Sequence, residues 1–155
     1  MILTRQSAKR RPELSLALAQ PAGTAARLLF RLIDEQLKAE PARGALAARA
    51  RGRLHMVYTD QGETISLSFK GDGRLEVASG FVGLPDASIL GPGQAVLRLC
   101  QLPGRGRDLI SAVRTPDRRR TLMRTLRESP VHVHSPVRSY GLLLALQRLI
   151  SVYQA

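Results

Sequence analysis

The sequence has 155 residues, enough for one domain whose core buries about two thirds of the unfolded surface. It carries 24 basic and 12 acidic side chains, a formal net charge of +12 at pH 7. This balance favours a polyanionic partner, either nucleic acid or an anionic membrane surface, although charge of this size also serves solubility alone. Three Phe, three Tyr and no Trp leave few aromatic platforms for stacking bases or sugars, and a single cysteine, Cys100, excludes an intramolecular disulfide.

The first 22 residues combine a basic run at residues 9–11 with the apolar stretch LSLALA. A proline and a glutamate interrupt the pattern, and the apolar stretch of about six residues is shorter than the core of a secretion signal. No stretch approaches the roughly 20 apolar residues that span a bilayer. We therefore expect a flexible basic tail over residues 1–22 and one folded domain over residues 23–155, in a cytoplasmic protein that is at most peripheral at the membrane.

Between residues 23 and 40, apolar side chains recur at helical spacing, with charged residues on the opposite side. The apolar positions are Ala25, Leu28, Leu29, Leu32, Ile33 and Leu37. The pattern predicts an amphipathic helix that ends near Pro41. The segment ARGALAARA after it is compatible with a short second helix.

After the helices the period changes from helical to alternating. The segments 53–59, 63–70 and 74–79 alternate apolar and polar residues, and the turns DQGE and GDG between them supply the Gly and Asp that tight hairpins require. The alternation predicts an antiparallel meander with one apolar and one polar face. The stretch DASIL predicts a fourth strand, with Ala87 and Ile89 pointing inward.

The second half of the chain predicts helices around one more strand. Pro92 suits the first turn of a helix, the segment 104–128 is rich in Arg, and VHVHS predicts a fifth strand with Val131 and Val133 on the core face. The closing segment 137–153 has an apolar arc of about half the helix circumference, so it must contact apolar material on two sides. The order of elements indicates an α+β fold, with a five-stranded, mainly antiparallel sheet covered on one face by helices.

The sequence contains little that indicates catalysis. His132 and His134 share one face of the fifth strand and would bind a metal only if a third ligand approached, whereas exposure on the polar face explains them more simply. There is no G-x-S-x-G motif, and the glycine-rich stretches lack the spacing and the lysine of a phosphate loop. We expect no enzyme activity, no metal and no cofactor.

The helix predicted over residues 116–127 displays five arginines outward. They are Arg118, Arg119, Arg120, Arg124 and Arg127. Such a surface would contact anionic lipid headgroups, bind nucleic-acid phosphates, or simply be solvated. Because exposed aromatic residues are not interleaved with these arginines, lipid is favoured over nucleic acid.

The pattern over residues 23–153 resembles the sterol carrier protein 2 family of lipid-binding domains. GRLHMVYTDQGETISLSFKGDGRLEVASG is similar to that family's first three strands, and LPDASILGPGQAVLRLC to its fourth strand and following helix, with Asp86 at the family's Asp. SPVHVHSPVRSYGLLLALQRLI is similar to its last strand and closing helix. The resemblance implies an apolar tunnel between sheet and helices for acyl chains, sterols or isoprenoids. Bacterial relatives include accessory proteins of ubiquinone biosynthesis.

The function we expect is non-enzymatic binding or transfer of an apolar lipid, with presentation to lipid-modifying enzymes at an anionic membrane. The sheet would supply one wall, made of Met56, Ile65, Leu67, Phe69 and Val77, and the helices the other, made of Leu97, Leu109, Leu143, Leu146 and Ile150. Burial alone would hold the ligand, at about 0.8 kcal/mol per methylene. The alternative is a basic nucleic-acid-binding or protein-interaction module whose core is filled.

Overall fold

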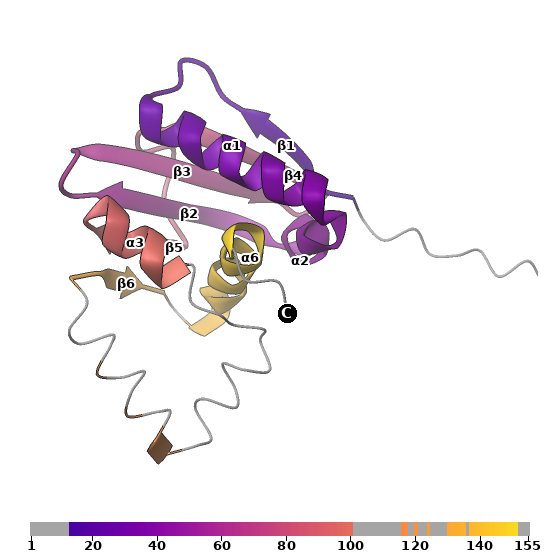
Figure 1. Cartoon of the computed structure of the whole chain (residues 1–155). Helices are drawn as coiled ribbons and strands as arrows, with labels where there is room; N and C mark the ends of the chain where they lie inside the picture. Colours follow the sequence, from indigo (N-terminus) through magenta and orange to yellow (C-terminus); the bar gives the residue numbers. More distant parts are fainter. Residues whose placement is uncertain are drawn as a thin grey trace, which may run out of the picture.

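The computed structural model describes residues 13–100, 116–117, 120, 124, 130–135 and 137–151. They form a single six-stranded sheet in the order β1-β4-β3-β2-β5-β6. Helices lie across one face of this sheet (Figure 1). No helix in these described ranges is long and apolar enough to cross a membrane.

The centre of the sheet is the predicted antiparallel meander. It consists of β2 (Arg51–Tyr58), β3 (Glu63–Lys70) and β4 (Arg74–Ser79). The turn from β3 to β4 places Gly71 and Gly73 at positive φ, which glycine adopts without strain. Between them, Asp72 accepts a hydrogen bond of 2.8 Å from the Arg74 side chain, and this bond lowers the pKa of the Asp72 carboxyl. Turn chemistry therefore fixes the register that the alternation predicted.

The prediction of five strands is wrong, because β1 (Ser15–Leu18) forms a sixth strand within the segment expected to be a tail. β1 pairs in parallel with β4, and its Leu16 and Leu18 pack against the hydrophobic core. Ser15 and Ala17 alternate with these leucines and are exposed, so the run LSLAL has the period of two that marks a strand. The sheet thus begins before residue 23.

The sheet is also mixed rather than mainly antiparallel. β5 (Ala87–Gly91) runs parallel to β2, while β6 (His132–His134) pairs with β5 in the antiparallel sense. A parallel pair requires a crossover, and residues 80–86 provide it by passing behind β3 and β2. Ala87 and Ile89 are buried, as predicted for this strand.

The helices divide the covered face between them. α1 (Thr24–Ala39) lies over β1, β3 and β4, whereas α6 (Tyr140–Ile150) lies over β2 and β5 and contacts α1 (Figure 1). α3 (Gly93–Cys100) lies along β5 beside α6. Three further short elements are η1 (Pro41–Arg43), α2 (Gly44–Arg49) and η2 (Val137–Ser139).

Two residues predicted to face the core are instead exposed. Leu28 of α1 is 60% accessible, because the buried stripe of this helix runs along Ala25, Ala26, Leu29 and Ile33. Val133 is 40% accessible because β6 is a three-residue strand at the sheet edge, paired on one side only.

The polar face of the sheet is partly covered by the crossover. The Ser66 hydroxyl donates to the Gly80 carbonyl at 2.6 Å and accepts from the Val82 amide at 3.0 Å. His55, which is buried, lies 3.3 Å from the Val82 carbonyl through Nε2 and contacts the Phe81 ring edge to face. These polar contacts therefore fix the crossover against the sheet.

Candidate functional site

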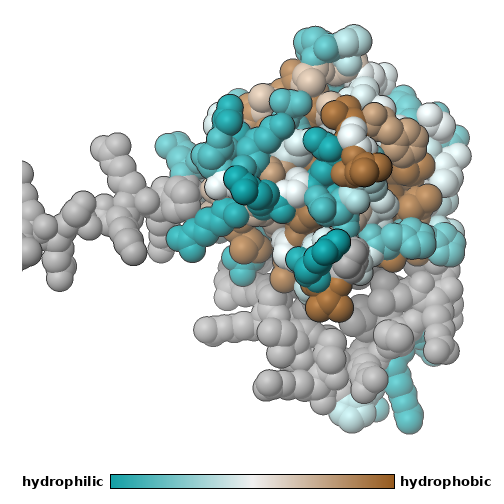
Figure 2. Space-filling view, turned by 180° about the vertical axis from the view of Figure 1, so that it is seen from behind, coloured by the Kyte–Doolittle hydropathy of each residue, from teal (hydrophilic) through white to brown (hydrophobic). Residues whose placement is uncertain are grey.

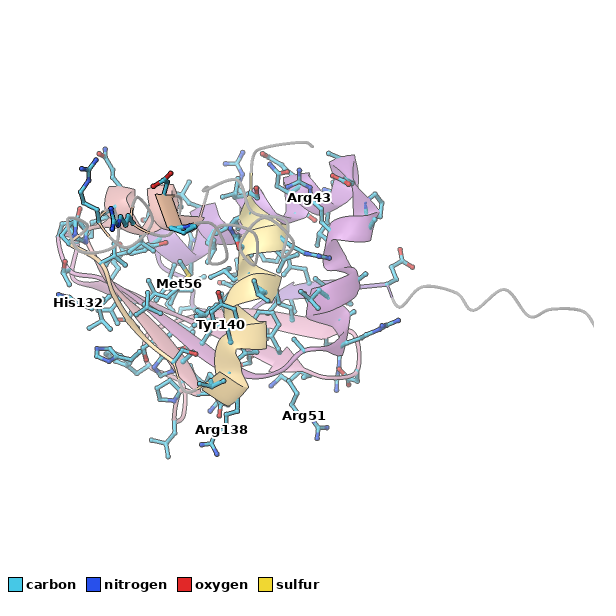
Figure 3. All side chains as sticks on the ribbon, turned by 90° about the horizontal axis from the view of Figure 1, so that it is seen from below. Arg43, Arg51, Met56, His132, Arg138 and Tyr140 are labelled. Carbon is cyan, nitrogen blue, oxygen red and sulfur yellow. The ribbon has the colours of Figure 1, made fainter. Side chains whose placement is uncertain are left out.

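The sheet wall of the predicted site is assembled by strand register. Met56 lies opposite Ile65, and Leu67 lies opposite Val77, so these side chains share the face that the helices cover. With Phe69 they complete the five predicted positions, and all five are at most 2% exposed. Figure 3 shows Met56 between the sheet and the helical layer. The alternation of apolar and polar residues in the sequence was sufficient to predict that these five side chains lie on the buried face.

The helical wall is only partly assembled in the described residues. Leu146 and Ile150 of α6 are buried in the same hydrophobic cluster, and Leu143 is partly buried against it. Leu97 of α3 is also partly buried. Leu109 lies outside the described residues. Of the predicted wall residues that the structure describes, Leu97 and Leu143 alone keep appreciable accessible surface.

Several residues of the same cluster were not among the predicted wall. On the helices these include Leu29 and Ile33 of α1 and Leu142 and Leu149 of α6. The sequence did mark an apolar stripe on α1. It gave no signal that α1 lies over β3 and β4, because periodicity identifies a buried face without identifying its partner.

Two carboxylates fix the helical layer to the sheet at one end. Glu63, the first residue of β3, accepts a hydrogen bond of 2.8 Å from the Ala25 amide in the first turn of α1. Asp60, in the turn before β3, accepts one of 2.9 Å from the Gly93 amide at the start of α3. Both satisfy helix amides that have no partner within the helix. These bonds position α1 and α3 over the apolar face.

The histidines of β6 lie outside the apolar layer. His132 and His134 are exposed, as predicted, and His134 lines a shallow open groove. The groove is bounded by Pro85, Asp86, Ala87, Ser88, Val133, His134 and Ser135. Within the described part of the chain, no group of three or more His, Cys, Asp or Glu side chains could hold a metal ion.

The arginine-rich surface falls largely outside the described residues. Arg120 and Arg124 are helical and exposed, in agreement with their predicted outward display. Arg118, Arg119 and Arg127 lie outside the described ranges, so contact of this surface with a membrane stays a prediction.

The comparisons with known proteins bear on the fold. No family model matches the sequence, and no curated protein is significantly similar to it. A solved structure described as "UbiJ-SCP2 Ubiquinone synthesis protein" superposes with a TM-score of 0.50 and 15% sequence identity, covering 82% of this chain and 96% of that one. The chain therefore has an SCP2-like fold, which confirms the resemblance drawn from its strand and turn pattern.

Proposed function

We propose that this protein binds an apolar lipid between its sheet and its helices and carries or presents that lipid without catalysing a reaction. The observation that carries the proposal is the combination of the SCP2-like fold with a helix-covered sheet face lined by aliphatic side chains. A fatty acyl chain, a sterol-like molecule and an isoprenoid or quinone lipid are the ligand classes that fit such a lining. The similar solved structure is described as a ubiquinone synthesis protein, so quinones are the first ligand class to test.

The ligand would reach the layer where α3 and α6 lie beside each other. Leu97 of α3 and Leu143 of α6 keep accessible apolar surface, whereas the other described wall residues are buried. A lipid tail that covers this surface gains about 0.8 kcal/mol for each methylene removed from water, so no charged contact is needed for useful affinity. Deeper insertion requires α3 and α6 to move outward from the sheet.

The protein would act by holding the ligand and releasing it to lipid-modifying enzymes. We propose that it does so in the cytoplasm, at the surface of an anionic membrane. Its net charge of +12 supports attraction to such a surface. This role needs neither a metal nor a cofactor.

A second candidate function is a basic interaction module whose interior is filled by its own side chains. The burial of all five predicted sheet-wall side chains by the protein's own residues favours it. A nucleic-acid-binding form of this module would retain oligonucleotides in a salt-sensitive manner, at least as strongly as it retains anionic vesicles. A lipid carrier would show the reverse preference.

Substitutions at the two accessible wall positions test the proposed site. Leu97→Gln with Leu143→Gln places polar amides where the lipid tail would lie, and each buried amide without a partner costs about 1–3 kcal/mol. We expect uptake of a fluorescent fatty acid or quinone to weaken at least tenfold. Leu146 is unsuitable for this purpose, because at 1% exposure a charge there would unfold the protein before it reported on a ligand.

Leu32→Gln is the matched control. Leu32 is also partly buried against the core, but it lies on α1, away from α3. Uptake should survive this change. Equal loss in both variants, or undiminished uptake in the Leu97 and Leu143 double variant, would remove α3 and α6 from the ligand site.

A further inference from the structure

The face of the sheet opposite the helices carries exposed apolar side chains. Phe81 and Leu84 of the crossover are 69% and 88% accessible, and Val137 of η2, the turn between the edge strand β6 and α6, is 94% accessible. Large apolar side chains that are so exposed on a protein surface commonly mark a binding site when they lie close together. Figure 2, which views the molecule from this side, shows brown apolar atoms at the surface beside teal hydrophilic ones.

The crossover and η2 are brought together at one end of this face. The groove that Pro85 and Asp86 line is also lined by His134 and Ser135, the residues that lead into η2. Leu84 directly precedes one side of this groove in the chain and Val137 follows the other side, so segments about fifty positions apart in the sequence meet there. The hydrogen bond of 2.8 Å from the Arg53 amide to Asp86 holds the end of the crossover in place.

Basic side chains surround these apolar ones. Arg51 and Arg138 are exposed, and Figure 3 shows both pointing away from the helical layer at the same edge of the molecule. Neither forms an ion pair with another residue in the described ranges. Alternation in the strands places further cations on this face, and basic residues outnumber acidic ones on it: Arg51, Arg53, Lys70, Arg74 and Arg138 against Asp72, Glu76 and Asp86.

We propose that this back face, defined by Phe81, Leu84, Val137, Arg51 and Arg138, docks on an anionic phospholipid bilayer. The apolar side chains would enter the headgroup region while the arginines contact lipid phosphates. The phosphates of a nucleic acid would also bind the arginines. They would leave Leu84 and Val137 without an apolar contact, since aliphatic side chains do not stack on bases as aromatic ones do. The proposal extends the proposed lipid carrier, yet docking does not require a ligand in the apolar layer.

The test is co-sedimentation of the full chain with vesicles of phosphatidylglycerol mixed with phosphatidylcholine, and with phosphatidylcholine alone. We expect binding to the anionic vesicles only. Leu84→Ser with Val137→Ser should weaken it about tenfold through lost apolar insertion. Arg51→Gln with Arg138→Gln should weaken it about fivefold for each arginine, and added salt should reduce what remains.

Residues of α1 supply matched controls on the opposite side of the molecule. Leu28 is an exposed leucine with 60% of its surface accessible, and Arg27 and Arg31 are exposed arginines beside it. Leu28→Ser, and Arg27→Gln with Arg31→Gln, should leave vesicle binding unchanged. Binding that falls equally in both sets, or only in the α1 set, would overturn the proposal, as would equal binding to neutral vesicles.

A fluorescence measurement gives an independent reading, because the chain contains no tryptophan. In Leu84→Trp, emission should shift to shorter wavelength when anionic vesicles are added, whereas Leu28→Trp should show no shift. The opposite pattern would place docking on α1. Fatty-acid uptake measured without vesicles should be unchanged in the Leu84 and Val137 variant, so a failure of docking is distinguishable from a failure of ligand binding; loss of both would contradict a separate docking surface.

Discussion

Gly52 in β2 shows how closely the closing helix approaches the sheet. Its φ of 136° is a conformation that residues with a side chain rarely adopt. A Cβ at this position would lie 2.9 Å from the Leu142 side chain and 2.9 Å from the Asp86 carboxylate. Glycine therefore lets α6 and the end of the crossover meet at the start of β2.

Replacing this glycine should destabilise the fold. For Gly52→Ala we expect a loss of about 1–3 kcal/mol in the free energy of unfolding, because the backbone strain cannot be relieved. Gly141, in the first turn of α6, has nothing within 4 Å of a built Cβ. Gly141→Ala should be neutral or add up to about 1 kcal/mol through helix propensity. Denaturant unfolding of both variants measures the difference, and an equal effect would contradict the role given to Gly52.

At the scale of elements, the strands of the meander were predictable and their partners were not. Alternation identified β2, β3 and β4 because each has one face in the core and one in solvent. It could not show that β5 pairs in parallel with β2, since pairing depends on where the crossover leads. β1 was missed because its LSLAL run follows the basic residues 9–11 and resembles the apolar part of a leader.

The contribution of β1 to the stability of the domain can be measured by substituting its core-facing and its exposed residues separately. Leu16→Asn with Leu18→Asn should lower the free energy of unfolding by about 1–2 kcal/mol, since both side chains are partly buried against the core. Ser15→Asn with Ala17→Asn changes the exposed positions of the same strand and should have little effect. Thermal unfolding followed by circular dichroism compares the two. Equal stability of the pairs would mean that β1 adds no core to the domain.

At the scale of the molecule, the fold separates two kinds of surface. The apolar layer lies between sheet and helices, and the five sheet residues predicted for its wall are buried in it because strand alternation and burial coincide; their contact with a ligand stays a prediction. The back face was expected to be simply polar. The crossover changed it, bringing exposed apolar side chains onto it through a long connection whose path the sequence pattern does not encode.

Native mass spectrometry of the purified full chain tests most directly whether the layer between sheet and helices holds a lipid. A carrier should retain a lipid of a few hundred daltons that is lost on denaturation, and added quinone or fatty acid should exchange with it at a ratio of one per chain. We expect both observations. A protein that carries no lipid from the cell and takes up neither compound would contradict the proposed function while leaving the SCP2-like fold intact.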